Sequence, residues 1–339
     1  MFIKRLWVFI LLTTCTFYGC NSKTFGTSND SIDIRMNRFD AALFRWIDSG
    51  AGADKSLLLQ EIIDEYPQLL GLLGKTLFQT NIIDSTEFFA RMETYYSEPT
   101  LKSLYSDALA LYSTHSPVVE LVEKELSRGF IGLKTLFPAM QLPAVYVHIS
   151  GLQQNMIVAD SLLSISIDRY MGADYPLYKN FFYDYQCKNM APERLAIDGL
   201  YAWLMSEFPF KDNEGALLER MIYEGKIAYV LTQIGNDYSA QKISSLTESE
   251  YQWCQKHEAA IWKTLIERKH LYATEAITVS RYFQSAPSTF IAADAPGNIG
   301  NFTGYQIVSR YMKQTKSSCK DLIINNNAQE ILKKSKYKP

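Results

Sequence analysis

The histidines of this chain are too few and too widely spaced for a catalytic zinc site. Such a site on a helix needs two histidines four residues apart, because one turn brings both imidazoles to one metal, and a glutamate beside the first acts as base. The chain has four histidines, His115, His148, His257 and His270. Every residue four positions before or after one of them is apolar or threonine, so no pair exists. The nearest approach is His257-Glu258, where Ile261 replaces the second ligand. We therefore expect no zinc, no other metal and no organic cofactor.

Nucleophile and phosphate motifs are also missing from the sequence. It contains no G-x-S-x-G elbow, no P-loop and no dinucleotide fingerprint after a strand. The segment PGNIGNFTG at 296–304 follows no predicted strand. We therefore interpret it as a loop that enters a helix rather than as a phosphate-binding loop. Cys187, Cys254 and Cys319 are far apart without a CxxC pair, which favours isolated buried thiols, although one disulfide is possible in an oxidising periplasm.

Two acidic residues are the best candidates for a site. Glu224 falls within an apolar stripe of the predicted helix 214–234, and Asp198 falls within a stripe of the predicted helix 192–207. The stripes consist of Leu217, Met221, Ala228 and Leu231 on the first helix and Leu195, Ala202 and Met205 on the second. Helical geometry therefore turns both carboxylates inward, where an isolated charge is costly.

Two hypotheses account for these inward carboxylates. In the structural one, each acid pairs with an arginine, a tyrosine hydroxyl or a helix N-terminus, and Arg194 and Arg220 stand one turn before Asp198 and Glu224. In the other, the acids belong to a ligand site, and the pKa of one of them rises because two like charges cannot both ionise cheaply in a dry cleft. The sequence favours the structural hypothesis, because no second metal ligand or nucleophile stands nearby.

The elements that position these residues are mostly helical. Helices are predicted at 56–66, at 84–96, from Ser116-Pro117 onward, at 192–207, at 214–234 and at 304–313. Short β-rich runs are predicted at 144–149, 155–158 and 162–167. This order predicts an α+β fold that is mostly helical, with a small antiparallel sheet packed against helices.

No Pro/Gly/Ser-rich linker divides the mature chain, so we expect a single globular domain over 31–316. The remainder, 317–339, is a basic tail, because residues 310–339 hold eight Lys and Arg against two acids. Such a tail could contact anionic lipid headgroups, but a solvated, frayed terminus is the favoured interpretation.

Composition excludes several classes of protein. With 47% apolar residues, 17 Gly and 11 Pro in 339 residues, the chain is neither collagen-like, nor low-complexity, nor a polytopic membrane protein. The 34 Lys and Arg are balanced by 36 Asp and Glu. Since phosphate neutralisation needs a basic face, we expect no nucleic-acid partner.

The N-terminus predicts export. Residues 1–19 form a secretory signal, in which Lys4 and Arg5 precede an apolar run too short for a membrane span. The run ends at Cys20, where the sequence resembles the lipobox of bacterial lipoproteins, whose cysteine carries acyl chains such as palmitate. The alternative is an ordinary cleaved signal with an incidental cysteine. Residues 20–30 then form a polar tether of mostly small residues. An acidic cluster after the cysteine resembles a surface-export signal of some envelope lipoproteins, and the tether has none. We therefore expect a periplasm-facing anchor in the cell membrane or outer membrane.

Four blocks, in order, carry a resemblance to a known family. They are SIDIRMNRFD at 31–40, LLSISIDRYMGADY at 162–175, LERMIYEGKIAY at 218–229 and PGNIGNFTGYQIVSRY at 296–311. Together they resemble the gliding-motility lipoprotein B (GldB) family of Bacteroidetes, over most of residues 31–312. The resemblance implies a cell-envelope lipoprotein that is associated, in gliding species, with the motility machinery.

The same blocks are similar to a zincin-like group of predicted metallopeptidases, in which an E-G-[LK]-A segment after the zinc helix supplies a further acidic ligand. Glu224-Gly225 matches that segment, whereas 192–207 stands in the place of the zinc helix and has no histidine. This implies a peptidase-like scaffold without its metal, with Asp198 and Glu224 beside a degenerate cleft between helices and sheet. We expect a non-catalytic lipoprotein that binds an envelope protein of the gliding or secretion machinery there. The alternative is an envelope hydrolase that uses the two carboxylates.

Overall fold

A computed structural model describes residues 32–50, 52–80, 86–211, 215–235 and 238–339. By their contacts, residues Ile32–Pro339 form one compact unit. The predicted signal peptide at 1–19, the lipidation site Cys20 and the tether at 20–30 lie outside the described residues.

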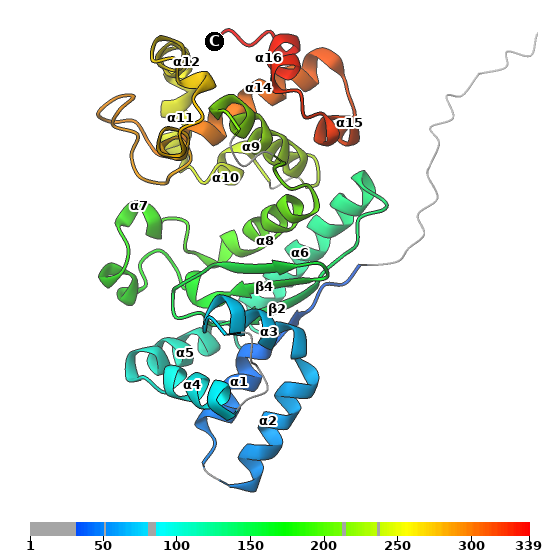
Figure 1. Ribbon diagram of the computed structural model, residues 1–339, viewed down its shortest axis with the longest axis vertical. Coiled ribbons are helices and arrows are strands. Elements are labelled where there is room, and N and C mark those ends of the chain that lie inside the picture. The colour runs from blue at the N-terminus through cyan, green and yellow to red at the C-terminus, as the bar shows by residue number, and fades with distance from the viewer. Residues whose placement is uncertain (1–31, 51, 81–85, 212–214, 236–237) are drawn as a thin grey trace, which may run out of the picture. The chain divides into compact units, whose positions relative to one another are not determined.

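The sheet has four short strands, β1 (Met36–Asn37), β2 (Ala144–His148), β3 (Met156–Ala159) and β4 (Leu162–Ser166). Their order is β1-β2-β4-β3 (Figure 1). Strands β1, β2 and β4 are parallel, and β3 and β4 form an antiparallel hairpin. The α+β class is confirmed, and the three predicted β-rich runs are strands.

The prediction of an antiparallel sheet is wrong for the central pair, because β2 and β4 are parallel. Only two residues separate β3 from β4, so these strands form a tight hairpin. The connection from β2 to β3 is longer and carries β3 to the sheet edge, so that β4 takes the place beside β2. Ala144 therefore pairs with Leu162 and His148 with Ser166 in parallel register. The carboxyl ends of β2 and β4 therefore lie next to each other at one end of the sheet.

Helices cover both faces of this sheet. Before the sheet come α1 (Phe39–Asp48), α2 (Ala53–Glu65), α3 (Pro67–Thr76), α4 (Thr86–Tyr96), α5 (Pro99–Leu111) and α6 (Pro117–Leu136). The predicted start of α6 is confirmed, because the Ser116 hydroxyl accepts a hydrogen bond from the Val119 amide at 3.3 Å. Helix α1 packs on β2, while α6 packs on α8 (Pro192–Glu207), which lies over β3 and β4 (Figure 1).

After the sheet, the described part of the chain forms helices joined by loops. It forms η1 (Ile167–Arg169), η2 (Pro176–Asn180), α7 (Asp184–Cys187), α8, α9 (Leu217–Thr232), α10 (Ala240–Ile243), α11 (Glu248–Lys256), α12 (Glu258–Glu267), η3 (His270–Tyr272), α13 (Ala276–Arg281), α14 (Ile299–Thr315), α15 (Cys319–Ile324) and α16 (Ala328–Ser335). The main apolar core surrounds the sheet, and a second core surrounds α14. Helix α9 contributes to both cores, with Ile227 in the first and Met221 in the second.

The prediction of a frayed tail at 317–339 is wrong. These residues form α15 and α16, and Leu322, Ile331 and Tyr337 are buried in the second core. Arg310 lies over the Tyr337 ring, with its guanidinium carbon 4.6 Å from the ring centroid. The many charges of this segment alternate with apolar residues at helical spacing, and those residues pack on the second core. The globular unit therefore extends to the C-terminus.

Helices α9 and α14 cross at a pair of glycines. A Cβ atom added at Gly304 would clash with the Met221 carbonyl oxygen and would lie 2.6 Å from its carbonyl carbon. One added at Gly225 would clash with the Gly304 carbonyl and would lie 2.9 Å from the Tyr305 amide nitrogen. Backbone therefore packs directly on backbone. The predicted loop into a helix is confirmed, but α14 begins at Ile299, so Gly304 lies inside the helix rather than before it.

Candidate functional site

Asp198 is held by an arginine and a tyrosine. Its Oδ1 lies 2.5 Å from Nη2 of Arg194, one turn earlier on α8, and its Oδ2 accepts a hydrogen bond from the Tyr170 hydroxyl at 3.2 Å. Burial raises the pKa of Asp198, and the charge of Arg194 opposes that rise. The carboxylate therefore sits in a neutralised pair.

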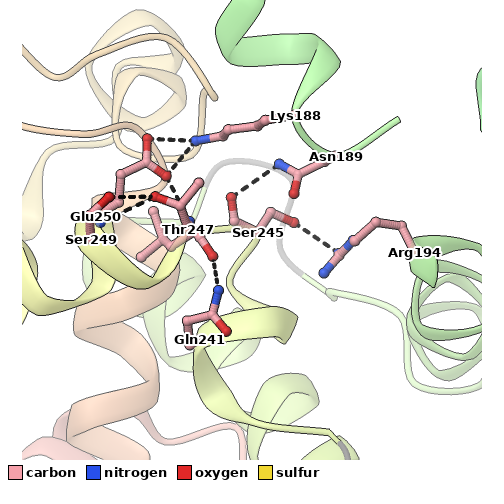
Figure 2. Close-up of polar contacts among 9 residues, drawn as sticks. Lys188, Asn189, Arg194, Gln241, Ser245, Thr247, Ser249 and Glu250 are labelled. Carbon is pink, nitrogen blue, oxygen red and sulfur yellow. Dashed lines mark hydrogen bonds and ion pairs between the residues drawn. The ribbon is translucent and has the colours of Figure 1, made fainter. Parts of the chain in front are cut away.

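Arg194 also joins two parts of the chain. Its guanidinium donates to the Ser245 hydroxyl, just after α10, at 3.1 Å (Figure 2). It also donates to the Lys242 carbonyl within α10. Next to it, Asn189 donates to the Ser245 carbonyl at 3.1 Å. Lys188 contacts both Glu250 oxygens, at 2.7 and 2.6 Å. Asp198 thus orients an arginine that fastens the start of α8 to the α10–α11 segment.

Glu224 is paired in the same way on α9. Its Oε1 lies 2.5 Å from Nη2 of Arg220, and its Oε2 accepts a hydrogen bond from the Tyr201 hydroxyl of α8. The Glu224 side chain is only 7% exposed, and the Arg220 guanidinium lies over the ring of Phe210. Burial and the charge of Glu224 raise the pKa of Tyr201 well above its ordinary value, so this hydroxyl stays a donor.

The two acids have different bonding partners. Asp198 is bonded by Tyr170 and Arg194, whereas Glu224 is bonded by Tyr201 and Arg220. Both arginines occupy the positions expected from the sequence. Across the described ranges, no group of three or more His, Cys, Asp or Glu side chains could hold a metal ion. This arrangement supports the structural hypothesis for both carboxylates.

A different acid, Asp168, organises the ends of the parallel strands. It lies in η1 directly after β4 and is fully buried. Its carboxylate accepts hydrogen bonds from the Leu152 amide at 2.6 Å, from the Ser150 amide at 3.2 Å and from the Ser166 hydroxyl. Burial raises the pKa of Asp168, and these bonds oppose the rise. The acid therefore fixes the loop that leaves β2.

That loop has an unusual backbone. Gly151 and Leu152 have φ angles of 68° and 67°, and the left-handed conformation is unfavourable for leucine. Further bonds hold the loop in place: the Tyr95 hydroxyl donates to the Ser150 carbonyl at 2.9 Å, and Arg169 donates to the Leu152 carbonyl at 2.9 Å. Neighbouring side chains thus impose the turn on the chain.

An apolar cavity of about 460 Å³ lies against this turn. Leu152 and Gly151 form part of its wall, together with Leu101 and Leu104 of α5. At the cavity Phe181 is 61% exposed, which is unusual for so large an apolar side chain. Ligands of open sheets often bind beyond the carboxyl ends of parallel strands, and this cavity occupies that position.

His148 and two serines lie near Asp168 without forming a catalytic relay. The His148 Nδ1 bonds to the Ser164 hydroxyl at 2.8 Å, whereas Asp168 bonds to Ser166 instead of the histidine. Burial lowers the pKa of His148 to about 3, so the ring is neutral. A nucleophile, its base and an orienting acid must share one line of hydrogen bonds, and these residues do not.

Sequence reasoning missed Asp168 as a site residue. Asp168 lies within LLSISIDRYMGADY at 162–175, a segment whose apolar pattern indicates only a strand. An acid directly after the apolar run LLSISI was the available signal, because a carboxylate at the end of a buried strand needs local donors.

Comparison with known proteins identifies one family. A sequence profile described as "Gliding motility protein GldB" matches residues 21–339. Neither the curated proteins nor the solved structures give a match. In the portion of the chain that the structure covers, no helix is both long and apolar enough to cross a membrane.

Proposed function

The chain belongs to the GldB family of gliding-motility lipoproteins, and from this premise we propose that it is a non-catalytic, lipid-anchored protein that binds an envelope partner of the gliding machinery. Membership makes it a membrane-associated protein of the cell envelope. We further propose that it faces the periplasm and that its scaffold resembles a peptidase without the metal.

The observation that supports a non-catalytic role is that Asp198 and Glu224 are each paired with an arginine. A hydrolase that used these carboxylates would need at least one of them free to take up or release a proton at the substrate. Each instead contacts an arginine at 2.5 Å and accepts a tyrosine hydrogen bond. Because both acids are already paired, we place partner binding away from them, at the cavity beside Gly151 and Leu152. Its apolar wall and the exposed Phe181 suit an apolar segment of a protein.

The anchor in this proposal is Cys20. Acylation stabilises membrane binding by about 0.8 kcal/mol for each buried CH₂ group, and the polar tether at 20–30 offers no other affinity. The Cys20→Ala variant should remain uncleaved or become soluble, as fractionation of cell envelopes would show. Normal cleavage and membrane retention of this variant would contradict the anchor.

The partner is tested in the source organism with its own copy of the gene deleted. Phe181→Ser should reduce surface spreading and co-purification of the envelope partner, because the exposed ring is lost from the cavity without disturbing the core. Ile277→Ser is the matched control, since Ile277 is 76% exposed on α13 and does not line the cavity. Equal behaviour of the two variants would contradict binding at this surface. Loss of spreading in Glu224→Gln with unchanged stability and partner binding would instead support the hydrolase.

A further inference from the structure

A second, smaller cavity lies where the end of α8, the middle of α9 and the end of α15 meet. Its volume is about 220 Å³, and its polar lining comes from Glu207, Lys211, Tyr223, Lys226 and Asn326. Pockets for drug-sized ligands are larger, roughly 300–1,000 Å³, so this one suits a small molecule or the end of a larger one.

Lys226 is the unusual group in this cavity. The residue is only 4% exposed, and its ammonium donates to the Ile323 carbonyl at 3.1 Å and the Asn325 carbonyl at 2.9 Å. An ammonium has three N–H groups, so one remains for another acceptor. No carboxylate of the described residues makes an ion pair with it. A buried cation that has only neutral acceptors is costly, and an anion in the cavity would remove that cost.

The charges around Lys226 define the kind of anion. Burial, together with the nearby positive charge of Lys211, lowers the pKa of Lys226 to about 8. Glu207 lies on the same wall, where burial raises its pKa. Among the described residues that line the cavity, two lysines and one glutamate leave a net charge of +1 when all three are ionised. A single negative charge balances this wall, whereas a dianion would be repelled by Glu207.

We propose that this cavity binds a single carboxylate group, carried by a small organic acid or by the end of a peptide chain, with Lys226 as its anchor. Lys211, which is exposed at the cavity, supplies the second positive charge. Asn326 also lines the cavity. This site is separate from the cavity at Phe181 and does not depend on the proposed function.

A purely structural role of Lys226 makes a different prediction. The two carbonyl acceptors belong to the end of α15, where a lysine favourably caps unpaired carbonyls. If capping were its whole role, the protein would be indifferent to carboxylates. If the cavity is a site, a carboxylate must stabilise the folded protein in a saturable way.

The test is a thermal unfolding titration of the purified full-length protein with sodium acetate, at neutral pH and at constant ionic strength maintained with sodium chloride. We expect a saturable rise in Tm with acetate and none with the neutral isostere acetamide. Lys211→Gln should weaken the apparent affinity about tenfold, since one charge-assisted contact is lost without change to the core. Lys226→Met should abolish the effect. Lys263→Gln is the matched control, because Lys263 is a 72% exposed lysine on α12 and should leave the affinity unchanged.

Lys211→Gln decides the matter if Lys226→Met does not fold. An acetate effect no different from that of chloride in the wild type would overturn the proposal, as would an effect retained in full by Lys211→Gln. An N-acetylated dipeptide and its C-terminal amide then distinguish the two sources. Stronger binding of the free-acid dipeptide than of acetate or the amide supports a chain end as the ligand, and binding of acetate alone supports a small acid.

Discussion

Replacement of Gly304 by alanine should separate helices α9 and α14. The added Cβ would lie 2.6 Å from the Met221 carbonyl carbon, whereas two carbon atoms need about 3.5 Å. The Met221 carbonyl oxygen lies closer still, so the helices must move apart by at least about 1 Å. A gap of about 1 Å already forfeits roughly a quarter to a half of the dispersion attraction along the crossing. Overpacking costs ~1–3 kcal/mol or more, while alanine returns ~1 kcal/mol of helix propensity.

We expect the free energy of unfolding to fall by about 2 kcal/mol and Tm by about 4 °C, measured by urea and thermal denaturation. Gly199→Ala on α8 is the matched control, because the nearest atom to its added Cβ is the flexible Ile165 Cδ1 at 3.3 Å. That variant should change stability by less than about 1 kcal/mol. The close crossing would be refuted if Gly304→Ala were no less stable than Gly199→Ala.

Three further predictions concern buried polar groups. Glu224→Gln should lower the free energy of unfolding and Glu224→Ala should lower it more, by ~3–5 kcal/mol, because Arg220 loses its counter-charge; recovery in an Arg220→Met, Glu224→Met double variant would confirm the cause, and an unchanged urea midpoint in Glu224→Ala would contradict it. Asp168→Asn should cost ~2–4 kcal/mol and speed amide hydrogen exchange at Leu152, since an amide cannot accept from all three donors; unchanged exchange would contradict its hold on the loop. His148 has a pKa of about 3 in the folded protein against an ordinary 6.5, so the unfolded chain binds more protons between these values, and stability should fall as pH drops through this window by up to about 1.4 kcal/mol per pH unit; an equally steep pH dependence in His148→Gln would contradict that assignment.

Local patterns predict α2, α4, α6, α8, α9 and α14 among the helices, and β2, β3 and β4 among the strands. The apolar stripe at 192–207 indicates α8, and the Ser-Pro start indicates α6. The inward turn of Asp198 and Glu224 also followed from helical spacing, as did the arginine one turn before each. These features depend on residues within a turn or two of each other, so the sequence contains the whole interaction.

Strand direction and the fate of the C-terminus were decided by long-range packing. The insertion of β4 between β2 and β3 makes the central pair parallel, and no short-range pattern distinguishes this from a meander. The tail at 317–339 appeared as a run of charge, yet Ile331 and Leu322 find a partner surface on the second core. Burial of a face requires a neighbour, and the neighbour is not adjacent in sequence.

The amino-acid sequence alone indicates the helical character of the chain, the strands β2, β3 and β4, the family resemblance, and an arginine one turn before each of Asp198 and Glu224. Only the tertiary structure showed that these acids belong to two separate pairs, that Asp168 fixes the turn at Gly151-Leu152 and that Lys226 is buried against the end of α15. The reason is physical: the charge state and accessibility of a side chain depend on donors, acceptors and desolvation supplied by segments far away in the chain. A sequence pattern can turn a carboxylate or an ammonium inward, but only the folded chain supplies its partners.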